Sequence, residues 1–371
     1  MKKNTFLIML LIIPIINCYN QTSEESFKSG KEKDSLKDYN GAISDFTKAI
    51  ELKSDFVDAY YDRGCAKISL NDYQGAIADF TKVIEIKPND AEAFHIRGLS
   101  KDALKSYQEA IADFTKAIEI KPDYDDAYYS RGYTKNEIKD YLGAIADFTK
   151  VIELKPNDEE AFHLRGFSKD ALKDYQGAIA DYTKAIEIKP DYEDSYYNRG
   201  VAKENLKDYQ GAIADYTKAT ELKPDDVEAF YNRGNTSYSI KDYQKAIDDY
   251  TKAIVINPNY EDAYLNRGFA KNTILDYPGA IADYTKALEI KPDDERVYIQ
   301  RGLTKDILKD YDGEIEDYTK VIKINPNNAE SFYNRGIVKI KNGQKDGCFD
   351  LNTAEELGSF EALEAIKKYC E

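Results

Sequence analysis

The twelve residues DYQGAIADYTKA occur at Asp174–Ala185 and again, unchanged, at Asp208–Ala219, 34 residues later. The surrounding sequence repeats with the same period from about Ser23 to Leu357, and residues 91–124 match residues 159–192 at 28 of 34 positions. The residues of a catalytic site occur once in a chain, each in its own environment. A stretch that occurs twice therefore indicates a repeated structural unit. A self-similarity of this period predicts an array of helix–turn–helix units.

Residues 159–192 illustrate how one repeat is expected to fold. A first helix is predicted over residues 160–173, and Asp174 then caps a second helix with its carboxylate. The second helix carries one apolar stripe at helical spacing, formed by Tyr175, Ala178, Ile179, Tyr182, Ala185 and Ile186. Pro190 ends that helix, and Asp191 or its neighbour is expected to cap the next one.

The same 34 residues, EEAFHLRGFSKDALKDYQGAIADYTKAIEIKPDY, resemble the tetratricopeptide repeat (TPR) family. They carry an aromatic residue at position 4, Gly at 8, Ala at 20, an aromatic residue at 24, Ala at 27 and Pro at 32. The resemblance covers nearly the whole chain after its first residues, in about ten copies. It implies an all-α, right-handed superhelical solenoid whose first helices line a concave groove. It also implies a binding scaffold without catalytic activity.

The N-terminus has the features of an export signal. Lys2 and Lys3 precede an apolar run over residues 6–16, too short to span a bilayer. The run ends in Ile15-Ile16-Asn17-Cys18, which resembles a bacterial lipoprotein box, although the residue before the cysteine is usually small. We therefore expect a signal peptide over 1–17, lipidation of Cys18 and a tether over 18–22; the alternative is an ordinary cleaved signal. The expected location is the bacterial cell envelope, anchored to the outer membrane, or else soluble in the periplasm or secreted.

The repeat array is predicted over residues 23–358, with altered units at both ends. The first unit, SEESFKSGKEKDSLKD, has polar residues where others have apolar ones, so it is either a solvating cap or a flexible tether. Residues 359–371 are expected to form a capping helix. Cys348 and Cys370 lie at similar distances from the turn before that helix, which favours a disulfide over two reduced cysteines. Cys65 remains as a free thiol.

Composition argues against nucleic acid and against catalysis. The net charge is −16 and no Lys/Arg-rich run is present, so the chain repels phosphate backbones. The two histidines, His95 and His163, occupy position 5 of two repeats and are too far apart to share a metal. No phosphate loop, calcium loop or nucleophile–base constellation occurs. We expect no catalytic residues, no metal site and no cofactor, and membrane contact only through the lipid anchor.

Two departures from the family pattern recur together. Position 7 carries Arg and position 11 mostly Lys, while position 23 carries Asp, as in Arg199, Lys203 and Asp215. The two helices of a hairpin bring positions 7 and 23 level, so each Arg is expected to pair bidentately with an Asp of its own or the preceding repeat. The alternative is an arginine row that binds anions.

The groove positions implied by the family resemblance are 2, 5, 6, 9, 12 and 13. Position 2 is acidic in most repeats, and position 6 in the second half of the chain reads Asn198, Asn232, Asn266, Gln300 and Asn334. Such amides can donate to and accept from peptide bonds, and the row resembles the asparagine ladder of the O-linked N-acetylglucosamine transferase. Aromatic side chains accompany it at Tyr197, Tyr231, Tyr133 and Phe167. The alternative is that these asparagines only solvate the inner face.

The predicted function is a non-enzymatic scaffold that binds a protein or peptide, of basic or extended character, in the concave groove. The alternative is a structural envelope component that assembles through its convex face or ends. An enzyme ranks third, since no polar cluster stands outside the repeat pattern.

Overall fold

A computed structural model describes residues 22–370, and throughout this range the regular structure is α-helical. The expected signal peptide and the lipidated Cys18 lie outside the described residues. The helices are α1(Ser23–Ser35), α2(Tyr39–Leu52), α3(Val57–Ser69), α4(Tyr73–Ile86), α5(Ala91–Ala103), α6(Tyr107–Ile120), α7(Asp125–Glu137), α8(Tyr141–Leu154), α9(Glu159–Ala171), α10(Tyr175–Ile188), α11(Glu193–Asn205), α12(Tyr209–Leu222), α13(Val227–Ser239), α14(Tyr243–Ile256), α15(Glu261–Thr273), α16(Tyr277–Ile290), α17(Glu295–Ile307), α18(Tyr311–Ile324), α19(Ala329–Lys341), α20(Gly347–Glu356) and α21(Phe360–Tyr369).

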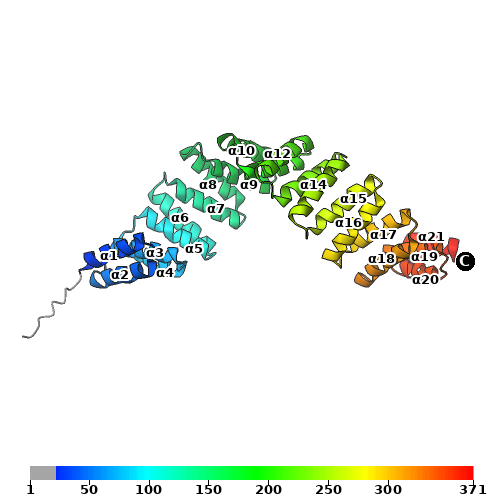
Figure 1. Ribbon diagram of the computed structural model, residues 1–371. Helices are drawn as coiled ribbons and strands as arrows, with labels where there is room; N and C mark the ends of the chain where they lie inside the picture. Colours follow the sequence, from blue (N-terminus) through cyan, green and yellow to red (C-terminus); the bar gives the residue numbers. More distant parts are fainter. Residues whose placement is uncertain (1–21, 371) are drawn as a thin grey trace, which may run out of the picture. The chain divides into compact units, whose positions relative to one another are not determined.

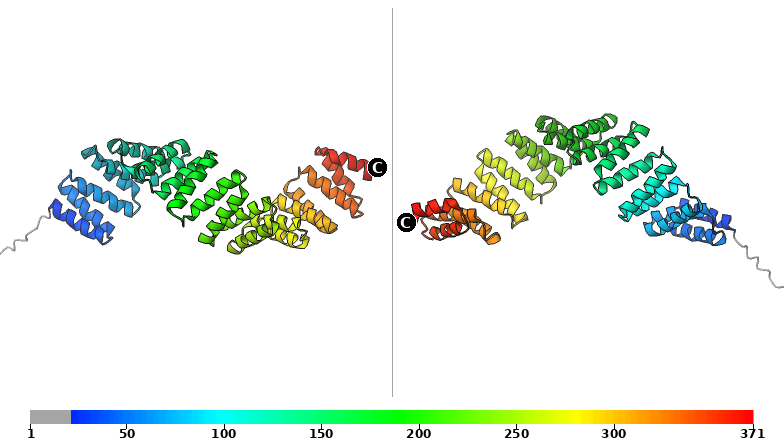
Figure 2. Two further views of the ribbon diagram at one scale, coloured as in Figure 1. Left: turned by 90° about the horizontal axis from the view of Figure 1, so that it is seen from above. Right: turned by 180° about the vertical axis from the view of Figure 1, so that it is seen from behind.

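The chain divides into two compact blocks, with the boundary between Pro156 and Asn157. The first block contains α1–α8 and the second contains α9–α21. Within each block the helices form consecutive antiparallel pairs that lie side by side (Figures 1 and 2). Each pair is one repeat, in which the first helix is called helix A and the second helix B. The all-α array of helix–turn–helix units predicted from the 34-residue period is confirmed.

Helix B begins with a close contact between an aspartate and a glycine. Asp208 accepts a hydrogen bond from the backbone N–H of Gly211 at 3.0 Å, and a Cβ on this glycine would lie 2.2 Å from Oδ2 of Asp208. The absence of a side chain therefore lets the cap carboxylate approach. The repeat at 227–260 carries Lys245 instead, and there the bond from Asp242 lengthens to 3.3 Å. Gly at this position is thus part of the cap.

The core of each repeat is built where a glycine of helix A meets an aromatic ring of helix B. A Cβ on Gly200 would lie 2.8 Å from the ring of Tyr216, which is fully buried. Alanines of helix B complete the contact, and Ala212 and Ala219 are fully buried. Small residues thus bring the two helices together and a large ring fills the space that remains. This arrangement follows the small and aromatic positions read from the repeat.

One expected cap is absent. Asp191 or its neighbour was expected to cap the following helix A, but the residue before α11 is Tyr192, which makes no side-chain cap bond. The same holds for Tyr124 and Tyr260 before α7 and α15. Repeats ending in Asp keep the cap, as Asp226 does for α13. The tyrosine rings at these positions pack against other aromatic rings instead. The ring of Tyr260, for example, lies 4.9 Å from the ring of Tyr231. At these helices ring packing therefore takes the place of a side-chain cap.

The predicted arginine–aspartate pairs are present in nine repeats, each within its own repeat. Nε lies 2.8–3.1 Å from Oδ2 and Nη2 lies 2.5–2.7 Å from Oδ1. The aspartates are almost fully buried, so the structural interpretation of these arginines is confirmed. Two partners were not anticipated. The lysine at position 11 lies 2.7–3.0 Å from the same Oδ2 in eight repeats, and Nη1 of Arg199 donates to Thr183 of the preceding repeat at 3.0 Å.

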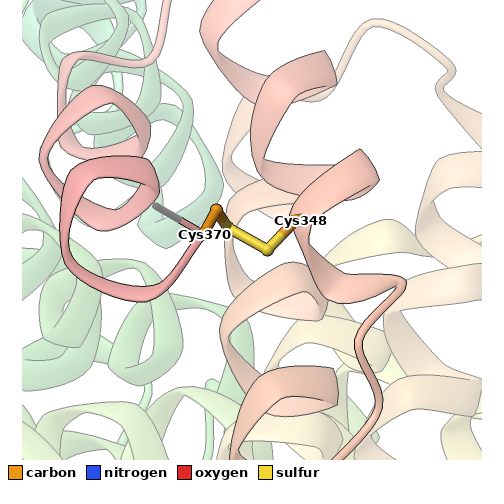
Figure 3. Close-up of a disulfide and its surroundings, with 2 residues drawn as sticks. All are labelled: Cys348 and Cys370. Atoms are coloured by element: carbon orange, nitrogen blue, oxygen red, sulfur yellow. A yellow bond between two sulfur atoms is a disulfide. The ribbon is translucent and has the colours of Figure 1, made fainter.

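Both ends of the array are folded. In the first repeat α1 begins with a capping box between Thr22 and Glu25 and packs on α2. Ser29 takes the place of the arginine and donates to Asp45 at 2.6 Å. At the other end, a disulfide joins Cys348 of α20 to Cys370 after α21 (Figure 3), with Cα atoms 5.9 Å apart. The described part of the chain contains no helix with the length and apolarity needed to cross a membrane.

Candidate functional site

Within each block, the helices A of neighbouring repeats approach one another. Close approaches join α1 with α3 and α5 with α7 in the first block, and α9 with α11 and α13 with α15 in the second. Hydrogen bonds between neighbouring helices A come mainly from positions 5, 6, 9, 12 and 13 of the repeat, with Ser195 at position 3 and Thr134 at position 10 as further partners. The first five are positions that the family resemblance assigned to the groove. We call the surface formed, within each block, by positions 2, 5, 6, 9, 12 and 13 of the helices A the A face.

Two asparagines of the predicted amide row bind tyrosines of the preceding repeat. Asn232 donates from Nδ2 to the hydroxyl of Tyr197 at 2.8 Å, and Asn266 donates from Nδ2 to the hydroxyl of Tyr231 at 2.9 Å. Burial raises the pKa of Tyr197 to about 12, so its hydroxyl keeps its proton and remains able to donate. The row therefore differs from a set of free amides, because some donors already serve to join repeats. The carboxamide oxygens of Asn232 and Asn266 remain the acceptors of this row.

The remaining amides of the row lie half-buried at the same height of their helices: Asn198 on α11, Gln300 on α17 and Asn334 on α19. Asn334 lines a cavity of about 380 Å³ with Glu330 and Tyr333, closed on its other side by residues 357–359 before the last helix. Asn266 lines a second cavity, of about 400 Å³, between α13 and α15. The amide row thus borders hollows of the A face rather than a flat surface.

Apolar side chains at position 9 are exposed on the A face in both blocks. Tyr133 of α7 is 46% exposed and Phe167 of α9 is 44% exposed. Leu99 and Leu303 at the same position are exposed to a similar degree. The same position of several repeats thus leaves a large apolar group in water.

The A face carries a row of carboxylates about one helical turn N-terminal to the amides. Position 2 is exposed and acidic at Asp58, Glu92, Asp126, Glu160, Asp194, Glu228 and Glu330. Arg296 interrupts this row and pairs with Asp294, with Nη2 2.6 Å from Oδ2. An exposed row of one sign attracts segments of the opposite sign, and salt screens that attraction.

The two histidines act as internal hydrogen-bonding groups. His95 contacts the hydroxyl of Ser130 through Nε2 at 3.0 Å and the hydroxyl of Tyr124 through Nδ1 at 3.1 Å. His163 contacts the hydroxyl of Ser195 through Nδ1 at 2.8 Å. Burial lowers the pKa of both rings below the usual value, so both are neutral near pH 7. Across residues 22–370 the structure brings together no group of side chains suited to hold a metal ion.

Among the described residues, the cysteine outside the disulfide, Cys65, is a poor nucleophile. Cys65 lies on α3 and is half-buried. Burial, with smaller contributions from Asp62 and Asp34, raises the pKa of its thiol to about 12. The thiolate that reacts is therefore scarce near pH 7.

Tandem antiparallel helix pairs joined through one repeated set of contacts define a helical repeat protein. Models of the tetratricopeptide repeat match residues 27–56, 57–90, 125–158, 193–226, 227–260, 295–328 and 317–349, and a model described as TPR repeat matches residues 103–138 and 171–207. Together these matches cover well over half of the chain, and the chain belongs to the tetratricopeptide repeat family. Members of this family are generally non-enzymatic scaffolds for protein interactions. No curated protein matches the chain.

Solved structures with the same fold are similar over large parts of the chain. The C-terminal part of a TPR repeat-containing protein from Cytophaga hutchinsonii is 20% identical, with a TM-score of 0.58, over 65% of this chain and 98% of that one. A tetratricopeptide repeat protein from Parabacteroides merdae is 17% identical, with a TM-score of 0.50, over 67% of this chain and 98% of that one. YrrB, described as a TPR protein with an unusual peptide-binding site, is 25% identical with a TM-score of 0.45 over 50% of this chain and 95% of that one.

Two features of the A face were missed from the sequence. The asparagine–tyrosine bonds join residues 35 apart, between position 5 of one repeat and position 6 of the next. Asn235 and Tyr238, which line the cavity between α13 and α15, had no predicted role. A signal for them was available, because residues 235–239 break the repeat pattern.

Proposed function

We propose that the A face binds an extended, basic segment of a partner protein. The observation that carries this proposal is the coincidence, on one face, of an acidic row at position 2, an amide row at position 6 and exposed apolar groups at position 9. Carboxylates attract the segment, amide groups bond its backbone without reading its sequence, and apolar groups contact its side chains. The surface is preformed, so little ordering of the scaffold opposes binding.

The charge component can be tested with a defined probe. A twelve-residue peptide of repeated Gly-Ser-Lys is titrated against the protein, with the Gly-Ser-Glu peptide as its comparison. The variant Asp194→Asn, Glu228→Gln, Glu330→Gln removes three exposed carboxylates of the A face. The control variant Glu187→Gln, Glu221→Gln, Glu289→Gln removes the same charge from helices B, where each glutamate pairs with a lysine three residues earlier.

The lysine peptide is expected to bind the native protein and the control, and to lose about tenfold in affinity on the A-face variant, since exposed pairs contribute ~0.2–1 kcal/mol each. The loss shrinks as salt rises. Equal affinity for all three proteins contradicts the proposal. That result favours the second candidate, a structural component that assembles through its other faces or ends.

Binding at the amide row is tested with natural partner proteins. Asn198→Ala with Asn334→Ala removes two amides, and crosslinking to a bacterial envelope extract compares the variant with the native protein at equal stability. A partner lost only from the variant supports binding at the amide row. A partner retained equally moves the interaction to another surface.

We further propose that the chain is exported and lipid-anchored in a bacterial envelope, on the basis of the apolar run over residues 6–16 and Cys18. Metabolic labelling with a fatty acid, in the native protein and in Cys18→Ser, tests this. Label in the native protein alone is expected. Label in neither, with the chain secreted, supports an ordinary cleaved signal.

A further inference from the structure

The repeat at 227–260 departs from its neighbours in one short stretch of helix A. Residues 235–239 read NTSYS, where the preceding repeat reads VAKEN at 201–205 and the following one reads FAKNT at 269–273. Ser237 stands where the other nine repeats carry lysine, and Tyr238 places a ring where the others carry a polar or aliphatic side chain. A chain that otherwise repeats so closely changes its sequence here in a block.

This block forms one side of the cavity between α13 and α15. Asn235, Tyr238 and Ser239 line it from α13, and the other walls are Tyr250 of α14 with Asn266 and Phe269 of α15. The volume, about 400 Å³, lies at the small end of ligand-binding pockets. Three of the six lining residues are aromatic and none is charged. The hollow therefore suits a neutral group with a flat apolar surface.

The walls of the cavity are held by hydrogen bonds. Oδ1 of Asn235 accepts from the hydroxyl of Tyr250 at 2.8 Å and from Nδ2 of Asn266 at 3.0 Å. These two bonds fix the carboxamide of Asn235; one hydrogen of its Nδ2 is directed to the Tyr231 hydroxyl, and the second remains as a donor. The Tyr238 ring packs edge-on against Tyr243, with centroids 5.2 Å apart, and its hydroxyl lies 3.3 Å from that of Thr273. A cavity whose walls are fixed in advance binds with little loss of side-chain entropy.

We propose that this cavity receives one aromatic side chain of the extended segment, with a basic residue two or three positions away along that segment. The aromatic ring matches the aromatic walls, and a hydroxyl or carbonyl beside it accepts from Asn235. Glu228 precedes Asn235 by two helical turns, about 10 Å, and Asp262 precedes Asn266 by one turn, about 6 Å, where it shares its charge with Arg296 at 3.6 Å. An extended chain advances ~3.3 Å per residue, so its basic side chain reaches these carboxylates two or three residues from the ring.

This inference rests on the proposed function, because it adds an anchor to the segment that the A face binds. A matched variant is available from the chain itself. This copied-repeat variant gives five positions of helix A and one of helix B the residues that the preceding repeat carries at the same positions, where they are compatible with the fold. Its six changes are Asn235→Val, Thr236→Ala, Ser237→Lys, Tyr238→Glu, Ser239→Asn and Lys245→Gly. Lys245 must also be replaced, because the lysine introduced at position 237 would approach it. In the repeat at 57–90 the two corresponding residues are in contact: Nζ of Lys67 lies 3.3 Å from the carbonyl oxygen of Gly75.

Two nine-residue peptides serve as probes, GSKSYSKSG and the same peptide with Ala at its centre. The native protein is expected to bind the tyrosine peptide at least tenfold more tightly, and the copied-repeat variant to bind both peptides alike. Equal affinity of the native protein for both peptides, or a tyrosine preference that survives in the variant, overturns the anchor while leaving binding by the A face intact.

N-acetyltyrosinamide separates the anchor from the rest of the A face. In ligand-observed NMR it is expected to contact the native protein and not the copied-repeat variant. The same result with no binding of either peptide supports the cavity and contradicts the proposed function. No contact with the native protein overturns the anchor.

Discussion

Lys203 lies 2.7 Å from Oδ2 of Asp215, the carboxylate that also binds Arg199 through both of its oxygens. One buried carboxylate thus stands between two cations, both mostly buried themselves. The repeat at 227–260 differs, because Ser237 leaves Asp249 with Arg233 as its close ionic partner. The two repeats form a natural comparison of a three-charge cluster with a two-charge pair.

Asp215→Asn should destabilise its repeat more than Asp249→Asn destabilises its own. The first change leaves two cations facing each other, and breaking a buried pair costs ~3–5 kcal/mol, whereas the second leaves one cation. Arg199→Gln should be milder than Asp215→Asn, since Lys203 still neutralises the carboxylate. Hydrogen exchange of α11 and α12 against α13 and α14 measures each effect locally. Equal losses for both aspartate variants would show that the lysine adds nothing.

A second prediction concerns Glu314, which stands on α18 at a position that Ala280 holds on α16. Its side chain is buried and Oε2 has no hydrogen-bond partner. Burial, with Asp306 adding to it and Lys341 opposing, raises the pKa of the Glu314 carboxyl from 4.5 to about 8. The unfolded chain therefore releases this proton near pH 4.5 while the folded chain keeps it until about pH 8.

The free energy of unfolding should fall between pH 4.5 and 8 through this group and then level off. Glu314→Gln should reduce the slope, and Glu314→Ala should stabilise the repeat by ~1–3 kcal/mol by removing an unsatisfied buried group. Urea unfolding at a series of pH values, native against variant, isolates the contribution. Parallel curves for native and variant would contradict it.

A third prediction separates two glycines at the same position of helix A. A Cβ on Gly200 would lie 2.8 Å from the Tyr216 ring, while at Gly302 the nearest atom, in Tyr318, is 3.6 Å away. Gly200→Ala should overpack the contact and cost ~1–3 kcal/mol. Gly302→Ala should be neutral or stabilise by ~0.5–1 kcal/mol, since alanine favours the helix. Thermal unfolding of both variants decides, and a matching loss at Gly302 would refute the steric account.

The fourth prediction concerns the disulfide. Cys348 and Cys370 close a loop with a sequence separation of 22, for which chain entropy gives ~3 kcal/mol. Reduction, or Cys348→Ser, should therefore loosen α20 and α21 and leave α11–α16 unchanged, because each repeat depends mainly on its neighbours. Hydrogen exchange with and without reductant measures this. Intact mass after alkylation of the unfolded protein should show two alkylated thiols more with prior reduction than without it, those of Cys348 and Cys370.

The repeat period was enough to predict the helices, their pairing and the arginine–aspartate contacts. Each of those contacts lies within one helical hairpin, where the position of the turn determines which residues of the two helices lie opposite each other. The lysine at position 11 was noticed but not placed, since the pattern does not show that Asp215 has room for a second cation. The bond from Asn232 to Tyr197 joins two repeats and depends on how they stack, which periodicity leaves open. The cavity beside Asn235 exists because the surrounding side chains leave a space unfilled, and this becomes visible only once the packing of the helices is known.

The bond from Arg199 to Thr183 carries a consequence for the length of the array. Eight described arginines of this set donate from Nη1 to the threonine 16 residues earlier, in the repeat before, and Arg233 donates to Thr220 as well, so this one contact recurs from junction to junction. Removal of residues 193–226 would bring Arg233 opposite Thr183, where Arg199 stands now. The arginine–threonine contact would therefore survive the loss or gain of a whole repeat, and recombination between near-identical copies can change the length of the array while keeping this contact at the new junction.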